Sequence, residues 1–236
     1  MTLYLKHKDF VDGQWFEISS DYNAITDRAC GIYGLCEEEC LMDEVNKNAN
    51  GFFDFGKSLI DIGSEDGSFA MFTNFSKNYC FEPNRNVCCL IWANMWLKDK
   101  VDNTFVYNVF LGDEDKKTMF NGFAGSGMPI SNIITDRGFG KEWVEVNVKK
   151  LDDYNIENVG LIKIDVEGAE AEVIRGSIDT IIRNNYPPIL FESHDVGNWG
   201  TTEEQRNELF SLIEGLGYTI MQHYAGTDAN HLAVKF

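Results

Sequence analysis

The sequence is poor in positive charge and in long apolar runs. Its 236 residues include 20 lysines and arginines against 38 aspartates and glutamates, which gives a net charge of -18. A field of this sign repels a phosphate backbone, so nucleic acid is not an expected partner. No apolar run approaches the roughly 20 residues of a membrane-spanning helix, so no transmembrane segment is expected. The first residues, MTLYLKHKDF, also lack the apolar segment of a secretory signal. These absences predict a soluble, cytoplasmic protein.

The cysteines lack the pattern of a metal site. All 6 occur without the paired spacing of a zinc ligand set and without a nearby histidine. We therefore expect reduced thiols that pack as small apolar side chains.

One apolar run leads directly into a glycine-containing loop. The run 58–62 is long enough for a buried strand, and Gly63 and Gly67 follow it. Glycine lets the backbone turn tightly and approach a ligand, as a nucleotide pocket at the end of a parallel strand requires. The third glycine of a dinucleotide fingerprint is missing, and Glu65 and Asp66 make the loop acidic. The loop therefore favours a cationic sulfonium over a pyrophosphate.

From residue 57 onward, predicted strands and helices alternate, which is typical of a sheet covered by helices on both faces. The expected strands are 58–62, 78–81, 104–111, 161–164, 189–192, 218–223 and 231–236. The expected helices are one after Gly67 and those at 85–96, 169–183 and 203–216. The last two strands form an antiparallel hairpin at one edge. The fold class is therefore α/β, with a seven-stranded, mostly parallel sheet and an antiparallel last strand.

Two segments fall outside this alternation. Residues 1–57 are expected to form an N-terminal cap or lid, with a hairpin near Asp12 and Gly13 and a helix over 37–47. Residues 117–148 contain two extra extended segments around a glycine-rich loop, which we interpret as an insertion that forms a flap on the substrate side. The main domain then covers 58–236.

Acidic residues end four of the predicted strands: Asp61, Glu82, Asp165 and Glu192. The carboxyl ends of parallel strands meet at one rim of the sheet, where ligands bind. Glu82 follows Asp61 by 21 residues, the spacing at which a carboxylate on the second strand accepts the hydroxyls of a ribose. The alternative for Glu82 is a surface acid beside a proline turn.

Several short motifs occur together in the chain. They are DIGSEDG from Asp61, FEPN at 81–84, Asn94, LDDY from Leu151, LIKIDVEGAEAEVIRG at 161–176 and PPILFESH ending at His194. In this combination the chain resembles the FkbM family of S-adenosylmethionine-dependent methyltransferases over about residues 38–236. The resemblance implies a class I methyltransferase (Rossmann-like) fold and O-methyl transfer, commonly to a sugar hydroxyl of a glycan, capsule or natural product. That family usually has alanine and asparagine at the positions of Ser64 and Glu65.

The resemblance also implies where S-adenosyl-L-methionine would bind. Its contacts would come from Asp61, Gly63, Ser64 and Gly67, with Glu82 on the ribose and Asn84 or Asp113 near the adenine.

An acceptor hydroxyl must lose a proton, so a base is expected at the same rim. His194 follows the fifth strand and titrates in the right range, which makes it the first candidate, with Asp165 second and Glu167 beside it. The alternative is that His194 only shapes the rim. His223 and His231 lie on the edge hairpin and are expected to be structural.

A divalent cation is an open alternative at this rim. Hard cations prefer several carboxylate oxygens, which Asp165, Glu167, Glu192 and Asp195 could supply. The favoured ligands are Asp165, Glu192 and Asp195, although their spacing is not diagnostic.

The sequence thus predicts an O-methyltransferase acting on a hydroxyl of a saccharide, or alternatively of a non-sugar small molecule. One rival is an NAD-dependent oxidoreductase on a similar sheet, which the acidic loop and the missing glycine disfavour. The other is a catalytically silent relative that binds the cofactor or a glycan. The oligomeric state is not indicated by any motif.

Overall fold

The central element of the fold is a seven-stranded sheet in the order β11-β12-β10-β9-β3-β4-β5. The structure is a computed structural model that describes residues 3–5, 16–18, 37–121, 143–197, 201–226 and 229–236. The strands are β3 (Ser58–Ile62), β4 (Lys77–Phe81), β5 (Thr104–Tyr107), β9 (Val159–Ile164), β10 (Ile189–Glu192), β11 (Thr219–Met221) and β12 (Asn230–Val234). Only β12 runs antiparallel to its neighbours, between β10 and β11. The predicted seven-stranded sheet with a reversed last strand is confirmed.

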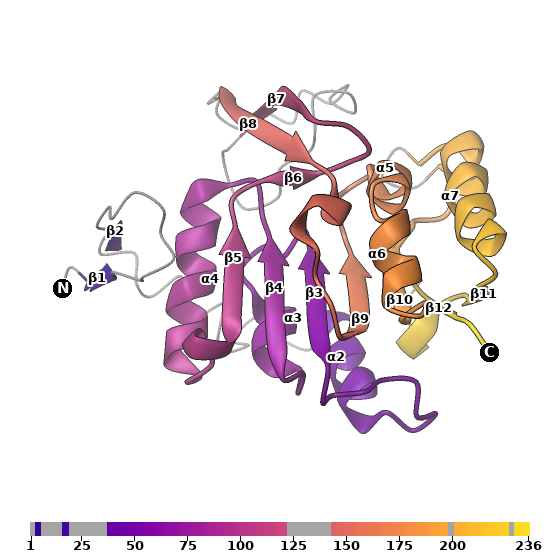
Figure 1. The fold of residues 1–236 in the computed structure, drawn as a ribbon, viewed down its shortest axis with the longest axis horizontal. Helices are drawn as coiled ribbons and strands as arrows, with labels where there is room; N and C mark the ends of the chain where they lie inside the picture. Colours follow the sequence, from indigo (N-terminus) through magenta and orange to yellow (C-terminus); the bar gives the residue numbers. More distant parts are fainter. Residues whose placement is uncertain (1–2, 6–15, 19–36, 122–142, 198–200, 227–228) are drawn as a thin grey trace.

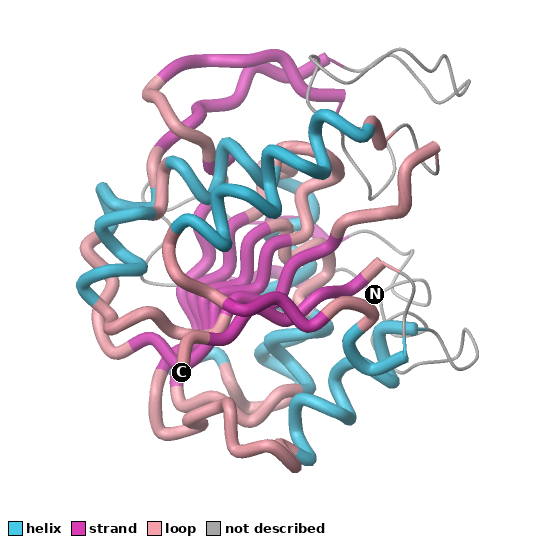
Figure 2. The backbone as a smooth tube through the Cα atoms, turned by 90° about the vertical axis from the view of Figure 1, so that its right-hand side faces the viewer, coloured by secondary structure: helices cyan, strands magenta, loops and turns pink. Residues whose placement is uncertain are grey.

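Helices cover both faces of this sheet, as Figure 2 shows. One face carries α2 (Glu37–Lys47), α3 (Ser68–Phe72) and α4 (Arg85–Leu97), and the other carries α5 (Glu170–Arg175), α6 (Ile178–Arg183) and α7 (Glu203–Gly215). Alternation along the strands divides the core, because Ile60 and Ile62 pack under α5–α7 whereas Leu59 packs under α2–α4. By the same alternation, Asp61 lies on the face of the sheet that Leu59 shares with α2–α4.

The third predicted strand is shorter than expected. Instead of running over 104–111, β5 ends at Tyr107, and β6 (Phe110–Leu111) joins another sheet. The Asn108 side-chain amide donates hydrogen bonds to the Glu82 and Pro83 carbonyl oxygens at 3.1 and 2.7 Å. These bonds turn the chain at the end of β4, a tertiary contact that strand propensity does not contain.

The predicted helix over 169–183 is two helices, α5 and α6. The chain breaks at Gly176, where an added Cβ would lie 1.9 Å from the Gly112 carbonyl oxygen. The Asp152 carboxylate of the LDDY motif accepts hydrogen bonds from the Asp179 and Thr180 N–H groups in the first turn of α6, whose own N-cap residue, Ser177, makes no side-chain capping bond. That motif lies in a short helical turn, Leu151–Tyr154.

A second sheet of three strands lies above the carboxyl ends of β3, β4 and β5 (Figure 1). It contains β6, β7 (Lys116–Asn121) and β8 (Trp143–Lys149), and β7 and β8 pair antiparallel. The two extra extended segments are confirmed. The glycine-rich loop between them lies outside the described residues, so the flap stays a prediction.

The N-terminal segment is described in part. The strands β1 (Leu3–Leu5) and β2 (Phe16–Ile18) pair antiparallel on either side of the expected turn, which itself lies outside the described residues. Leu41 and Val45 of α2 are buried in the core under α3 and α4. This helix therefore packs against the sheet, while the division into a cap and a main domain at residue 57 stays a prediction.

Two other features bear on sequence expectations. Among the described residues, no helix is long and apolar enough to cross a membrane. Cys80, Cys88 and Cys89 are free thiols, as expected, and the side chains of the other three cysteines lie outside the described part of the chain.

The break at Gly176 gives a test of the packing between α5 and the small sheet. We expect Gly176→Ala to lower the free energy of unfolding by about 1–3 kcal/mol, because the new methyl group overlaps the Gly112 carbonyl. The matched control is Gly215→Ala in α7, which meets nothing within 4 Å and should be neutral or stabilising by up to about 1 kcal/mol. Urea denaturation of both variants measures the difference, and equal midpoints would contradict this account.

Candidate functional site

The glycine loop after β3 is joined closely to the end of β9. Gly63 has a φ of +75°, and a Cβ there would lie 1.7 Å from the Asp165 carbonyl oxygen. The Asp165 N–H in turn donates to the Ile62 carbonyl at 2.9 Å. Only glycine fits both the left-handed backbone and this approach. The contact places Asp165, the first residue after β9, directly beside the predicted cofactor loop.

The loop is also braced from inside by buried polar side chains. The Ser64 hydroxyl donates to the Asp61 carbonyl at 2.7 Å and accepts from the Phe81 N–H at 3.1 Å. The Asn94 side-chain amide of α4 donates to the Asp66 carbonyl at 2.7 Å. The Ser64 side chain and the Asn94 motif residue therefore set the shape of the loop.

Glu82 lies between this loop and the segment after β4 and accepts hydrogen bonds from both. Its Oε2 accepts from the Glu65 N–H at 3.2 Å and its Oε1 from the Asn84 N–H at 2.7 Å. The side chain is 5% exposed, and burial raises the pKa of its carboxyl to about 8 even though the two N–H groups act in the opposite direction. Glu82 is thus fixed and nearly buried at the rim, and its contact with a ribose stays a prediction.

Glu65 adopts a left-handed backbone, with a φ of +46°, and its side chain is exposed. Asparagine adopts this conformation more readily than glutamate does. The backbone therefore gives a physical reason for the asparagine that the FkbM family usually has here, and the contact with Glu82 uses the backbone N–H of Glu65, which either residue supplies.

The centre of the site contains a residue that the sequence reasoning missed. Lys163 of β9 is only 5% exposed, and its Nζ lies 3.2 Å from Asp165 Oδ2 and 3.8 Å from Asp61 Oδ1. Asp61 itself is fully buried beside it, in register on β3. The available signal was a single charge inside the otherwise apolar run LIKI.

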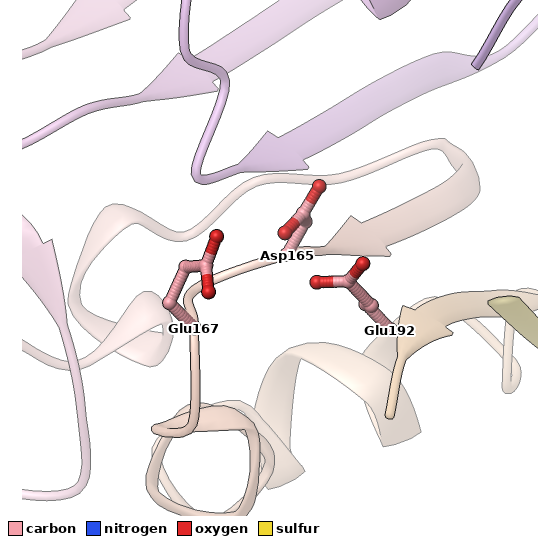
Figure 3. A group of neighbouring side chains, drawn as sticks. All are labelled: Asp165, Glu167 and Glu192. Atoms are coloured by element: carbon pink, nitrogen blue, oxygen red, sulfur yellow. The ribbon is translucent and has the colours of Figure 1, made fainter. Parts of the chain in front are cut away.

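Three carboxylates gather where β9 and β10 end (Figure 3). Asp165, Glu167 and Glu192 each place an oxygen within 4.8 Å of the others. Burial, and then the neighbouring Asp165 carboxylate, raises the pKa of Glu192 above its ordinary value. The group has oxygen ligands of the kind that divalent cations prefer.

This group contains two of the three residues predicted as metal ligands. Asp165 and Glu192 are brought together, and Glu167 joins them. Asp195 is exposed instead, with its Oδ1 3.8 Å from an Arg206 guanidinium nitrogen. A divalent cation at this rim stays a prediction.

His194 lies at the same rim, with its Nε2 3.4 Å from Glu192 Oε1. Two other histidines, His223 and His231, have different surroundings. His231 is fully buried, its Nε2 lies 3.0 Å from the Ser193 carbonyl oxygen, and burial lowers its pKa to about 4. Its Nδ1 accepts from the His223 N–H at 3.2 Å. This neutral ring supports the residue before His194 and fits the predicted structural role.

The Asp113 side chain is engaged by an arginine of α5. Its carboxylate accepts a hydrogen bond from Arg175 Nε at 2.8 Å, and its backbone lies against Gly176 at the end of α5. Asn84, the other candidate for the adenine, is buried beside Glu82.

Glu170 supports the loop that carries Asp165 and Glu167. Its Oε1 accepts from the Val166 N–H at 3.3 Å and from the Gly168 N–H at 3.0 Å. Burial raises the pKa of this carboxyl to about 7. Glu170 is therefore an internal brace and was absent from the predicted site residues.

Comparison with known proteins agrees with the motifs and the fold. A family model described as the Methyltransferase FkbM domain matches residues 61–220. The chain belongs to the FkbM methyltransferase domain family.

Individual relatives of this FkbM domain are distant. The 2-O-methyltransferase NoeI of Sinorhizobium fredii (strain NBRC 101917 / NGR234) is 26% identical over 149 residues, which cover 54% of this chain and 60% of NoeI. The chain thus spans 60% of the length of that curated relative.

Solved structures show the same fold. The FkbM methyltransferase of Methylobacillus flagellatus KT matches with a TM-score of 0.55 and 16% identity, covering 92% of this chain and 56% of that one. An O-methyltransferase of Bacillus cereus, solved in complex with SAH, matches with a TM-score of 0.50 and 9% identity, covering 97% and 94%. The class I methyltransferase fold predicted for the FkbM domain is confirmed.

The brace in this FkbM domain predicts a pH-dependent stability. The folded-state pKa of Glu170, about 7, lies above its ordinary value of 4.5, so the folded protein holds this proton more tightly than the unfolded chain does. The stability that Glu170 contributes is therefore present at pH 4.5 and is lost as the pH rises to about 7.

The variant Glu170→Gln keeps an oxygen for both N–H groups and cannot ionise. We expect its free energy of unfolding to exceed that of the wild type by about 1–3 kcal/mol at pH 8 and to match it near pH 4.5. Urea denaturation at the two pH values measures this, with the exposed Glu214→Gln as control. A gain of the same size at both pH values would show that ionisation is not the cause.

Proposed function

We propose that this chain transfers a methyl group from S-adenosyl-L-methionine to an acceptor hydroxyl. The observation that carries the proposal is Glu82, a nearly buried carboxylate held by two backbone N–H groups between the glycine loop of β3 and the end of β4. Its position is that of a ribose acceptor in a Rossmann-like site. Membership of the FkbM family supports the reaction type.

The residues of the rim fit this cofactor better than a dinucleotide. S-adenosyl-L-methionine supplies an activated methyl group on a cationic sulfonium and has a ribose but no phosphate. The strand ends present Asp61, Glu82 and Asp165, and the loop 63–68 contains no basic residue. Lys163 is the cation near them, and it lies within 4 Å of two carboxylates. The Asp61 and Asp165 carboxylates repel a pyrophosphate and attract a sulfonium or an ammonium group.

In this proposal the loop residues Asp61, Gly63, Ser64 and Gly67 surround the methionine portion, Glu82 accepts the ribose hydroxyls, and Asn84 lies toward the adenine. Asp113 stays a weaker proposal because its carboxylate is engaged by Arg175. Much of the rate can come from alignment, since a well-oriented approach of two reacting groups contributes up to ~7–11 kcal/mol.

We propose that His194 is the base that removes the proton of the acceptor hydroxyl. Glu192 lies within 3.4 Å of its Nε2 and orients the imidazole toward the rim where Asp165 and Glu167 also lie. Asp165 is the second candidate base. His231 contacts the Ser193 carbonyl oxygen, and its full burial keeps it from acting as the base.

We further propose a saccharide as the acceptor, with a non-sugar small molecule as the alternative. This step is supported by the FkbM resemblance and by the 2-O-methyltransferase among the relatives. Screening nucleotide sugars and free glycans for methylated product by mass spectrometry tests it. Absence of product from every class of acceptor, despite cofactor binding, would favour a silent binding module instead.

Cofactor binding is testable without knowledge of the acceptor. At about 100 times its dissociation constant, S-adenosylhomocysteine should add about 2.7 kcal/mol of stability, which corresponds to a melting temperature raised by about 5–10 °C. Glu82→Ala should abolish most of this shift because it removes the ribose acceptor. The exposed Glu157→Ala should keep the shift. No shift in the wild type, or an undiminished one in Glu82→Ala, argues against the assigned pocket.

A substitution of His194 should change turnover without changing cofactor affinity. With an acceptor from the screen, His194→Ala should lose roughly 10²- to 10⁴-fold in turnover, the usual contribution of a positioned base. Its affinity for S-adenosylhomocysteine should stay that of the wild type. His223→Ala, on the exposed side of the edge hairpin, is the matched histidine control. Wild-type turnover in His194→Ala would transfer the role to Asp165.

A further inference from the structure

Lys163 occupies a position that apolar side chains usually fill. It lies on β9 at the centre of the sheet, in register with Asp61 of β3 and Leu190 of β10. Its neighbour two residues earlier, Leu161, belongs to the core under α3, and the Lys163 Nζ lies 5.5 Å from the ring of Phe69 in that helix. Central parallel strands that are covered on both faces normally read as continuous apolar runs. The lysine departs from that rule.

The Lys163 ammonium connects two parts of the site. On one side is Asp61, which precedes the glycine loop by one strand residue and lies 3.8 Å from the ammonium. On the other side is Asp165, 3.2 Å away, which opens the acidic group with Glu167 and Glu192 (Figure 3). One cation therefore joins the proposed cofactor side to the proposed acceptor side.

Stability alone does not account for this arrangement. Charges buried in a protein lose their hydration, and replacing a buried ion pair by packed apolar residues is often neutral or stabilising. Here a fully buried aspartate and a buried lysine lie in a strand pair whose other members are apolar or small. We therefore attribute the buried ion cluster to the function of the site and not to the stability of the core.

We propose that Lys163 is a positioning residue for methyl transfer, which holds the Asp61 and Asp165 carboxylates at a fixed separation across the β3–β9 strand pair. This inference rests on the proposed function. The lysine contacts neither substrate nor cofactor; it acts through the two carboxylates, so that a ligand on the β3 loop and an acceptor at the Asp165 side are held in register.

The first experiment is calorimetry with S-adenosylhomocysteine. Lys163→Met removes the ammonium and keeps an unbranched chain, Lys163→Arg keeps a cation, and Lys117→Met is the control on β7, where the lysine is exposed and paired with Glu145. We expect at least a tenfold weaker affinity for Lys163→Met, a smaller loss for Lys163→Arg, and no change for Lys117→Met. Unchanged affinity in Lys163→Met would overturn the inference.

A double-mutant cycle tests whether Lys163 acts through Asp61. The affinity lost by Asp61→Asn with Lys163→Met together should be smaller than the product of the two single losses, because both remove the same link. A loss equal to that product would overturn the positioning role. Failure of the wild type to bind S-adenosylhomocysteine would overturn the proposed function, so the two failures are distinguishable.

A measurement on the ligand-free protein needs no binding. Nitrogen-15 spectra of the lysine ammonium groups should contain a signal protected from exchange with water that is absent in Lys163→Arg and shifted in Asp165→Asn. This measurement tests the Lys163–Asp165 ion pair, on which the inference rests, even where Lys163→Met does not fold. Absence of a protected signal, or its persistence unchanged in Asp165→Asn, would overturn the inference.

Discussion

The site depends on the close approach of the β3 loop to the end of β9. Because Gly63 has no side chain, the Asp165 carbonyl can lie where a Cβ would otherwise be, at 1.7 Å from that position. The Asp165 N–H meanwhile extends the parallel pairing of β3 and β9 by one hydrogen bond to Ile62. The glycine loop and the acidic loop are therefore parts of one structure. Glu82, Ser64 and Asn94 then hold the rest of the glycine loop against this junction.

Charge is the second constraint on this rim. Carboxylates from β3, β4, β9 and β10 converge there, and each would raise the free energy of ionising the others. The structure relieves this repulsion in two ways: Lys163 lies between Asp61 and Asp165, and backbone N–H groups donate hydrogen bonds to Glu82 and Glu170. The rim is therefore rich in acidic residues, and these residues have defined hydrogen-bond donors or a cation beside them.

The differences between expectation and structure have a common cause. The third strand ends at Tyr107 because Asn108 bonds to carbonyls 25 and 26 residues earlier, and the helix after β9 breaks at Gly176 because another loop occupies its side. Lys163 was missed for the same reason, because its partner Asp61 lies on another strand and comes beside it only when β3 and β9 pair. Asp195 was grouped with Glu192 by proximity in sequence, whereas the fold turns it toward Arg206.

The sequence by itself determined the order of strands and helices, the reversed last strand, the glycine loop and the acidic strand ends, because these follow from local periodicity, turn chemistry and the shared direction of parallel strands. It also identified the FkbM family through motifs. Only the tertiary structure decided which acids meet, which are braced by N–H groups, and which cation lies among them. Those relations depend on distances between β3, β9 and β10, and the paired residues of β3 and β9 are about one hundred positions apart in the chain.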